Sequence, residues 1–138
     1  MTIVLVIVIS YAIGALPFGL LLGKIAHGVD VRAYGSGKIG MTNVLRTTGT
    51  KSAILVLLLD VSKGVFAVFL ARVLTGSDTV EVAAAIATIV GHNWSIFIRF
   101  TGGRGTATGF GALLLMAYPA NIAAIAIAMP VTYPFLFI

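Results

Sequence analysis

Apolar runs alternate with polar segments along this chain of 138 residues, and two of the polar segments are rich in glycine. Long apolar runs cover residues 2–22, 52–74 and 106–129, and a shorter one covers 82–90 and extends toward Phe100. A helix needs about 20 mostly apolar residues to cross a lipid bilayer. The pattern therefore predicts an all-α, polytopic membrane helix bundle with about four to five transmembrane helices and two Gly-rich loops.

The composition places this bundle in lipid rather than in water. Hydrophobic residues make up 59% of the chain and charged residues 9%, whereas about 25% of the residues of a soluble domain are charged. The length suits a single integral membrane domain, residues 1–138. Because no basic segment precedes the first apolar run and no cleavage site is apparent, we expect a retained helix rather than a signal peptide.

The last part of the chain is apolar but irregular. Pro119 and Asn121 interrupt the run 106–129, and the tail 130–138 contains two prolines. The sequence stops on an apolar run without a polar flank, which indicates a chain truncated at its C-terminal end. A bundle with such an apolar end favours a partner helix or an oligomer. Cysteine is absent, which excludes disulfides and thiolate chemistry.

The charged residues predict how the helices are oriented. The polar segment 24–51 carries five Lys or Arg residues and one acid, Asp30, and the second Gly-rich segment carries Arg99 and Arg104. Two predicted spans separate these segments, so both lie on one side of the membrane and the short acidic segment 75–81 lies on the other. An excess of Lys and Arg marks cytoplasmic loops. We therefore expect both Gly-rich loops in the cytoplasm and the N-terminus outside.

Both Gly-rich segments have the composition of an anion-binding loop. A Gly-rich run beside a helix start offers closely spaced backbone N–H groups to phosphate. Residues 35–46 add Ser, Thr, Asn and Arg side chains, and residues 102–105 repeat the pattern around Arg104. Two such loops on one face indicate a site for two phosphates. The alternative is structural, because glycine serves turns and basic residues near a membrane set topology or contact anionic headgroups.

Ionisable residues near the apolar runs are further candidates. His92 lies where an apolar stretch meets the second polar segment, so it is either a hydrogen-bonded structural residue or part of the site. Asp60 and Lys63 share one face of a predicted span, where charges are either paired or functional. His27 is interpreted as a loop residue and Trp94 as an interfacial anchor. The sequence has no His, Cys, Asp and Glu cluster at metal-ligand spacing, and neither G-x-x-x-x-G-K-[ST] nor G-x-S-x-G.

Three stretches resemble those of the bacterial acyl-phosphate:glycerol-3-phosphate acyltransferases of the PlsY type. The first is G-S-G-K-I-G-M-T-N-V-L-R at residues 35–46, and the second is D-V-S-K-G at residues 60–64. The third joins G-H-N-W-S-I-F at residues 91–97 to Phe100 and to G-G-R-G-T-A-T at residues 102–108. The resemblance runs in the family's order and spacing as far as about residue 111.

The resemblance implies a reaction, a bacterial cell-membrane location and a set of site residues. A fatty acyl group passes from acyl phosphate to the sn-1 hydroxyl of glycerol 3-phosphate, giving lysophosphatidic acid and phosphate. Ser36 and Arg46 orient and neutralise the acyl phosphate. His92 hydrogen-bonds the reacting groups, and either His92 or a substrate phosphate oxygen accepts the hydroxyl proton. The acyl chain lies between helices, open to lipid. No metal, other cofactor or nucleic acid is implied. The remaining implied substrate-binding residues are Gly35, Gly37, Lys38, Gly40, Thr42, Asn43, Lys63, Gly102, Gly103, Arg104 and Gly105.

The chain departs from the family pattern at several positions. Lys38 and Ile39 stand where the family has Asn-Pro, and Met41 stands where it has Ala. Ser95 replaces a Pro, and Arg104 replaces the usual Lys and keeps the charge, although the two side chains are not interchangeable at a tight site. Family members are longer and carry a further motif, after additional spans, that this chain lacks.

Two other interpretations remain beside the acyltransferase. One is an inactive or truncated member of the family, which the missing motif and Lys38 favour. The other is a carrier for a phosphorylated solute, since basic loops suit the entry of an anion. A carrier needs a site near the midplane that is reached from both sides, and only Asp60 and Lys63 are candidates there.

Overall fold

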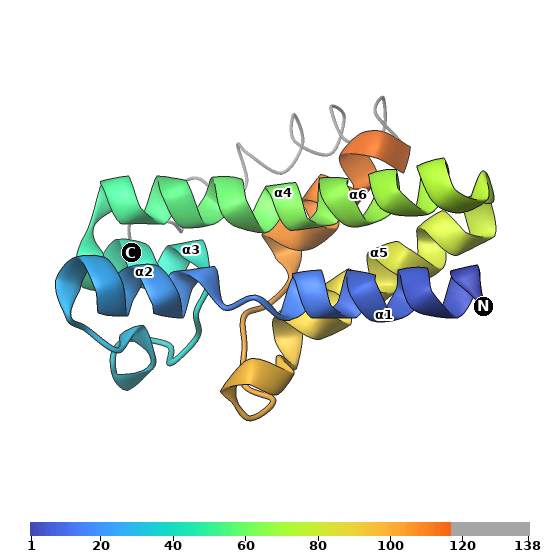
Figure 1. The fold of residues 1–138 in the computed structure, drawn as a ribbon. Helices are drawn as coiled ribbons and strands as arrows, with labels where there is room; N and C mark the ends of the chain where they lie inside the picture. Colours follow the sequence, from blue (N-terminus) through green and yellow to red (C-terminus); the bar gives the residue numbers. More distant parts are fainter. Residues whose placement is uncertain (117–138) are drawn as a thin grey trace.

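A computed structural model of the chain describes residues 1–116, and these residues form helices joined by short loops. Figure 1 shows their arrangement. The elements in chain order are α1 (Thr2–Ala15), α2 (Phe18–His27), η1 (Val31–Ala33), α3 (Met41–Thr48), α4 (Thr50–Thr75), α5 (Asp78–Asn93), η2 (Ile96–Ile98) and α6 (Thr106–Met116). The prediction of an all-α membrane bundle is confirmed, and within the described residues the only β-type pairing is an isolated bridge between Ser95 and Thr101.

The first apolar run forms one candidate span, as predicted, but this span extends to His27 and its helix is interrupted. The helix breaks between α1 and α2, where Leu16 is extended (φ −60°, ψ 116°) ahead of Pro17. A residue before proline is pushed out of the helical region, and proline donates no hydrogen bond. Helix α2 then continues to His27 and ends at Gly28, whose φ of 65° suits a glycine cap.

Two further features differ from the sequence-based expectation. Helix α5 begins at Asp78, so Asp78 and Glu81 lie in its first turn rather than in a loop. Negative side chains are favourable at that helix end, which explains why the helix is longer than its apolar stretch. The polar segment 24–51 contains the unexpected helix α3. The rest of the expected span 106–129 and the tail, with Pro119 and Asn121, lie outside the described residues.

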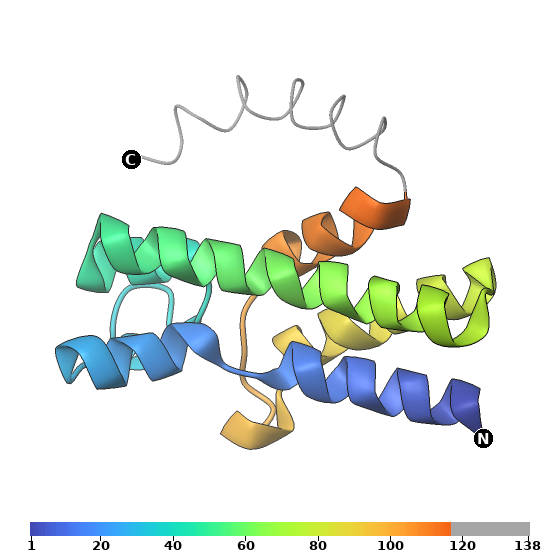
Figure 2. The same cartoon turned by 45° about the horizontal axis from the view of Figure 1, so that its top comes forward.

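Small residues let the long helices approach closely. Helix α4 runs along the length of the bundle beside α1 and α2, with α5 and α6 packed against it (Figures 1 and 2). A side chain at Gly64 of α4 would collide with the backbone of Thr108 in α6, and one at Gly111 would collide with Val61. Gly14 of α1 meets α5 in the same way. Such glycine contacts are typical of helix packing in membranes.

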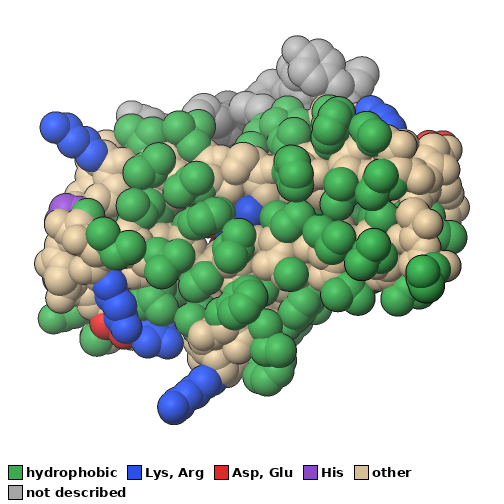
Figure 3. Space-filling model, viewed as in Figure 1, with side chains coloured by type: hydrophobic (Ala, Val, Ile, Leu, Met, Phe, Trp, Pro, Cys, Tyr) green, Lys and Arg blue, Asp and Glu red, His purple; other side chains and the backbone are tan. Residues whose placement is uncertain are grey.

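The outer surface is apolar, as expected for contact with lipid. Two helical segments, Thr2–His27 and Thr50–Thr75, are long and apolar enough to cross a membrane. Figure 3 shows hydrophobic side chains spread over one whole face, with most Lys and Arg side chains toward its ends and edges. Exposed large hydrophobic residues of α4 include Leu58, Phe66 and Phe69. Burial in lipid, not in protein, accounts for these side chains.

An ion pair connects α4 and α5 at the end of the bundle opposite the Gly-rich loops. Arg72 of α4 contacts Glu81 of α5 with an Nη2–Oε2 distance of 2.7 Å. The same guanidinium donates a hydrogen bond to the backbone oxygen of Leu115 in α6 at 3.1 Å. This contact joins three helices at the end where α4 turns into α5.

Candidate active site

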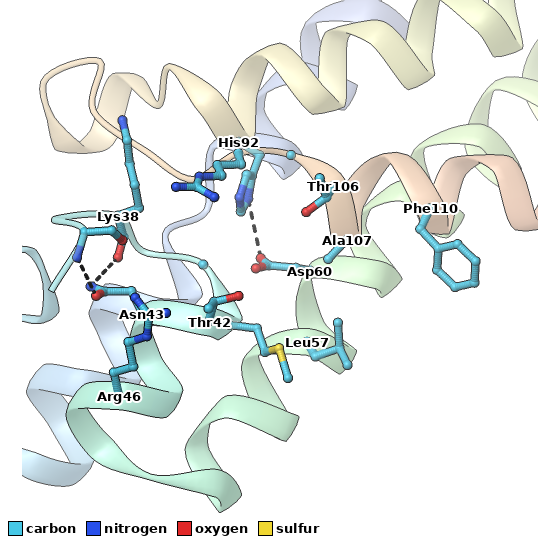
Figure 4. Close-up of a pocket in the computed structure, with 15 residues that line it drawn as sticks. Lys38, Thr42, Asn43, Arg46, Leu57, Asp60, His92, Thr106, Ala107 and Phe110 are labelled. Carbon is cyan, nitrogen blue, oxygen red and sulfur yellow. Dashed lines mark hydrogen bonds and ion pairs between the residues drawn. The ribbon is translucent and has the colours of Figure 1, made fainter. Parts of the chain in front are cut away.

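Both Gly-rich loops contribute to one cavity of about 630 Å³. The cavity lies among the first loop, α3, the middle of α4, the end of α5 and the start of α6 (Figure 4). The lining residues are Ser36, Lys38, Gly40, Met41, Thr42, Asn43, Arg46, Leu57, Asp60, His92, Arg104, Gly105, Thr106, Ala107 and Phe110. Segments that are about 60 residues apart in the sequence therefore meet around one space.

The first loop is folded around the buried side chain of Asn43. The amide nitrogen of Asn43 donates to the backbone oxygens of Val31 and Lys38 at 2.7 and 2.8 Å, and its oxygen accepts from the backbone N–H of Ser36 at 3.0 Å. Gly35 has a φ of 56° and lies so close to Asn43 that a side chain there would strike its amide oxygen. The asparagine thus supports the loop and holds Ser36 at the cavity wall.

A hydrophobic cluster lies beneath this loop. Ile39 is 2% exposed and packs with Val44 of α3, Val56 of α4 and neighbouring apolar residues. Burial of a side chain of this size stabilises a fold by about 1.5–3 kcal/mol. Ile39 therefore anchors the loop where the family pattern has proline, while the adjacent Lys38 stays exposed at the cavity.

Replacing Asn43 with alanine is expected to loosen the first loop. The change leaves the backbone oxygens of Val31 and Lys38 without their amide donor, and an unsatisfied buried polar group costs about 1–3 kcal/mol. Tryptic cleavage after Lys38 should accelerate by about tenfold or more, because local opening becomes that much more frequent. Thr48→Ala, in the same helix, is the control, and equal cleavage rates in both variants would contradict the role of Asn43.

The second Gly-rich loop wraps closely around His92. The backbone N–H of Gly103 donates to the backbone oxygen of His92 at 3.1 Å. A side chain on Gly103 would collide with Nε2 of the His92 ring, and one on Gly102 would collide with the backbone oxygen of His92. Gly105 has a φ of 72° and leads into α6. Glycine is required at these two positions because the backbone of His92 at Gly102, and its imidazole at Gly103, occupy the space that a side chain would take.

Asp60, Lys63 and His92 form a buried cluster between α4 and α5. The Lys63 Nζ lies 2.9 Å from Asp60 Oδ1, and the two side chains are only 2–3% exposed. The His92 Nδ1 lies 3.3 Å from Lys63 Nζ and 3.5 Å from Asp60 Oδ1. The paired interpretation of the two charges is therefore observed, and the pair also contacts the histidine at the cavity.

Three cations line the cavity, and one nearby basic residue is neutralised. Lys38, Arg46 and Arg104 have no carboxylate within 4.0 Å among residues 1–116. Arg32, by contrast, is paired with Asp30 at 2.7 Å. The hydrogen bonds from the Arg32 guanidinium hold the pKa of Asp30 well below its usual range, so this acid remains charged near neutral pH. The cavity itself thus keeps a net excess of positive charge.

The structure brings together most, but not all, of the residues expected at the site. Ser36, Lys38, Gly40, Thr42, Asn43, Arg46, His92, Arg104 and Gly105 line the cavity, whereas Gly35, Gly37, Gly102 and Gly103 lie in the loop backbone behind it. Lys63 does not line this cavity, and its expected contact with substrate stays a prediction. It lines instead a second, mostly apolar cavity of about 410 Å³ near the α1–α2 break.

Several cavity residues were missed by the sequence analysis. Asp60, the acidic one, was noticed as a charge within an apolar span and as part of the D-V-S-K-G stretch, but it was not assigned to the site. The apolar wall consists of Met41, Leu57, Ala107 and Phe110. Single apolar residues in helices carry no signal that separates a cavity wall from core or lipid contact. The cavity thus combines a cationic part with an apolar part.

A family model described as glycerol-3-phosphate acyltransferase matches residues 4–137. A glycerol-3-phosphate acyltransferase of Dinoroseobacter shibae is 45% identical over 126 residues, covering 91% of this chain and 62% of the relative. Glycerol-3-phosphate acyltransferase 2 of Moorella thermoacetica is 50% identical over 113 residues, covering 82% of this chain and 58% of the relative. The chain therefore spans about 60% of the length of these curated relatives.

Two solved structures share the fold. A crystal structure of PlsY (YgiH), an integral membrane glycerol 3-phosphate acyltransferase, in its glycerol 3-phosphate form has a TM-score of 0.89 and 29% sequence identity. The match covers 96% of this chain and 66% of that one. The lysophosphatidic acid form of the same protein gives a TM-score of 0.85 at 28% identity.

Proposed function

The chain belongs to the glycerol-3-phosphate acyltransferase family, and on that premise we propose that it transfers a fatty acyl group from acyl phosphate to the sn-1 hydroxyl of glycerol 3-phosphate. The observation that carries the proposal is the cavity in which both Gly-rich loops meet. Its three cations suit two phosphate-bearing substrates, and its apolar wall suits a fatty chain. The products are lysophosphatidic acid and inorganic phosphate.

The proposed reaction needs positioning more than covalent catalysis. The sn-1 hydroxyl oxygen forms a bond to the acyl carbonyl carbon, the bond between that carbon and the phosphate oxygen breaks, and phosphate leaves. The hydroxyl proton is accounted for by the phosphate product, so no other reactant is required. Holding two reactants in line can lower a barrier by about 7–11 kcal/mol. Cations at the site also stabilise the negative charge of the transition state.

The residues divide between the two substrates according to their loops. Ser36 and Arg46, from the first loop and α3, are assigned to the acyl phosphate, and Lys38 adds charge to the same side. Arg104 and the backbone around Gly105, at the start of α6, are assigned to glycerol 3-phosphate. Each assignment rests on the position of the residue at the cavity and on the suitability of Arg and backbone N–H groups for phosphate.

The apolar part of the cavity is assigned to the acyl chain. Leu57 and Phe110 lie on one side of it (Figure 4), and Met41 also lines the cavity. Thr42 lies on this cavity wall, and Asn43 keeps the loop in shape. A fatty chain in this position stays close to the lipid-facing helices, and its burial is favourable by about 0.8 kcal/mol per CH₂.

We further propose that both Gly-rich loops face the cytoplasm of a bacterial cell, across the cell membrane from the turn between α4 and α5. The loops meet at one cavity and carry most of the basic residues, which favours the cytoplasmic side. The opposite end carries Asp78 and Glu81 in the first turn of α5.

Cysteine labelling tests this orientation, since the chain has no cysteine of its own. Ala33→Cys lies on the loop side and Thr79→Cys on the opposite side, and both positions are exposed. A membrane-impermeant maleimide is expected to label Thr79→Cys in intact bacteria and Ala33→Cys only after permeabilisation. The reverse pattern would overturn the proposed orientation.

Product formation from acyl phosphate and glycerol 3-phosphate separates the proposed enzyme from the other interpretations. Purified chain in lipid vesicles is expected to release phosphate and form lysophosphatidic acid in equal amounts from acyl phosphate and glycerol 3-phosphate. Omission of either substrate should abolish both products. Uptake of labelled glycerol 3-phosphate into sealed vesicles without product would instead support a carrier, and a folded chain with neither property would support an inactive family member.

A further inference from the structure

The Lys63 ammonium lies at the centre of the buried cluster and close to three acceptor atoms. Its Nζ is 2.9 Å from Asp60 Oδ1, 3.2 Å from the backbone oxygen of Gly14 and 3.3 Å from His92 Nδ1. The side chains of Lys63, Asp60 and His92 are only 2–4% exposed. A lysine ammonium has three N–H donors and no acceptor. The ammonium therefore forms an ion pair with the Asp60 carboxylate and hydrogen bonds with the Gly14 oxygen and with His92 Nδ1.

This arrangement determines which nitrogen of His92 carries the proton. The Asp60 carboxylate favours the charged form of Lys63, because an opposite charge within about 4–6 Å stabilises it. A proton on Nδ1 would place an N–H group opposite this ammonium at 3.3 Å. The carboxylate oxygen nearest to that His92 N–H group would be Asp60 Oδ1, which lies 3.5 Å from Nδ1 and already pairs with Lys63. These contacts therefore favour Nδ1 as an acceptor.

A doubly protonated His92 is disfavoured by the charges of the same cluster. Protonation would place a second cation beside Lys63 with only Asp60 to balance the two. Burying an unbalanced charge is strongly unfavourable. The neutral ring with its proton on Nε2 satisfies Lys63 and keeps the cluster electrically balanced.

We propose that Lys63 is a positioning residue that holds His92 as the neutral Nε2–H tautomer, so that His92 donates a hydrogen bond into the cavity rather than acting as a base. His92 lines the cavity (Figure 4), and Nε2 faces Gly103 of the second Gly-rich loop. No protein group of residues 1–116 makes a hydrogen bond to Nε2. The N–H is thus free to meet an oxygen of a bound molecule.

The partner of this donor is an anionic oxygen, and this step rests on the proposed function. A substrate phosphate oxygen or the carbonyl oxygen that becomes negative in the transition state has the required chemistry. A His92 ring that is protonated on Nε2 cannot also accept the sn-1 hydroxyl proton, because its only unprotonated nitrogen is Nδ1, which faces Lys63. The proton is then taken by a phosphate oxygen of the substrate itself.

Nitrogen NMR of labelled histidine tests the proton position without any need for turnover. The chain has two histidines, so His27→Gln leaves His92 as the single labelled ring. We expect spectra of this variant in lipid bilayers near neutral pH to show a protonated Nε2 and an unprotonated Nδ1. A protonated Nδ1, alone or together with Nε2, would overturn the proposal.

Two substitutions extend the test to Lys63 and to the role of the donor. Lys63→Met in the same labelled protein should abolish the single tautomer, whereas an unchanged Nε2–H spectrum would show that Lys63 does not hold the ring. His92→Gln can still present an N–H donor near the position of Nε2, but His92→Asn cannot reach it. Glutamine should therefore retain kcat/KM within about tenfold and exceed asparagine, whereas equal losses of about 100-fold or more would indicate a base.

These readouts distinguish the inference from the proposed function. A chain that makes no lysophosphatidic acid but shows the Nε2–H tautomer would refute the proposed function and leave the positioning role of Lys63 in place. If Lys63→Met does not fold, the spectrum of the His27→Gln protein and the comparison of His92→Gln with His92→Asn still decide whether His92 is an Nε2–H donor.

Discussion

Replacing Arg46 with glutamine is expected to lower kcat/KM for acyl transfer by about 100- to 1000-fold. Arg46 lies on α3 at the cavity and has no carboxylate partner within the described residues, so its charge is available to a bound phosphate. Loss of one donor that stabilises transition-state charge typically costs this much in rate. Because the phosphate of the acyl donor is also the leaving group, the effect should appear in kcat as well as in KM.

Lys51→Gln is the matched control for Arg46→Gln. Lys51 lies at the start of α4, is exposed and does not line the cavity, and its replacement removes the same charge. We expect it to retain nearly full activity. Steady-state kinetics in lipid, with each substrate varied in turn, checks both variants. Similar losses in the two variants would mean that the total positive charge matters and that Arg46 has no specific place at the phosphate.

Replacing Gly103 with alanine is expected to lower kcat/KM by about 100-fold or more. The added methyl group would collide with Nε2 of the His92 ring. The imidazole has little room to move, because Lys63 and Asp60 hold its other edge. A displacement of about 1 Å in a positioned group can cost about 100-fold in rate. Kinetics with glycerol 3-phosphate as the varied substrate measures the loss.

Gly109→Ala provides the control for Gly103→Ala. Gly109 lies in α6 outside the cavity lining, and a side chain there would meet only the flexible end of Ile89 at 3.3 Å. Alanine also favours a helix over glycine by about 1 kcal/mol, so this variant should remain folded and active. Full activity of Gly103→Ala would contradict the close packing of the second loop on His92.

The sequence was sufficient for the family, the all-helical membrane class and the existence of two Gly-rich loops. These properties follow from long apolar runs and from local motifs, which are visible without knowledge of contacts. The break at Pro17 and helix α3 were not predicted. A proline inside an apolar run is compatible with either a kinked or a broken helix, and the short α3 depends on the packing of Val44 beneath the first loop.

The composition of the cavity was only partly accessible to sequence reasoning. Motifs selected Ser36, Arg46 and His92, and the structure places all three at one cavity. The contact between Lys63 and His92 spans 29 positions and depends on how α4 packs on α5, so spacing along one helix indicated only the pair with Asp60. The inward position of Phe110 likewise depends on tertiary packing.

Formation of lysophosphatidic acid is the most direct test of the central claim, that this chain transfers an acyl group at the cavity between its two Gly-rich loops. Purified chain in lipid would receive acyl phosphate and labelled glycerol 3-phosphate, beside Ser36→Ala. We expect product from the original chain and about 10- to 100-fold less from Ser36→Ala, since a hydrogen bond to a charged group contributes about 1.5–3 kcal/mol. No product from a folded sample, or equal product from both proteins, would contradict the account.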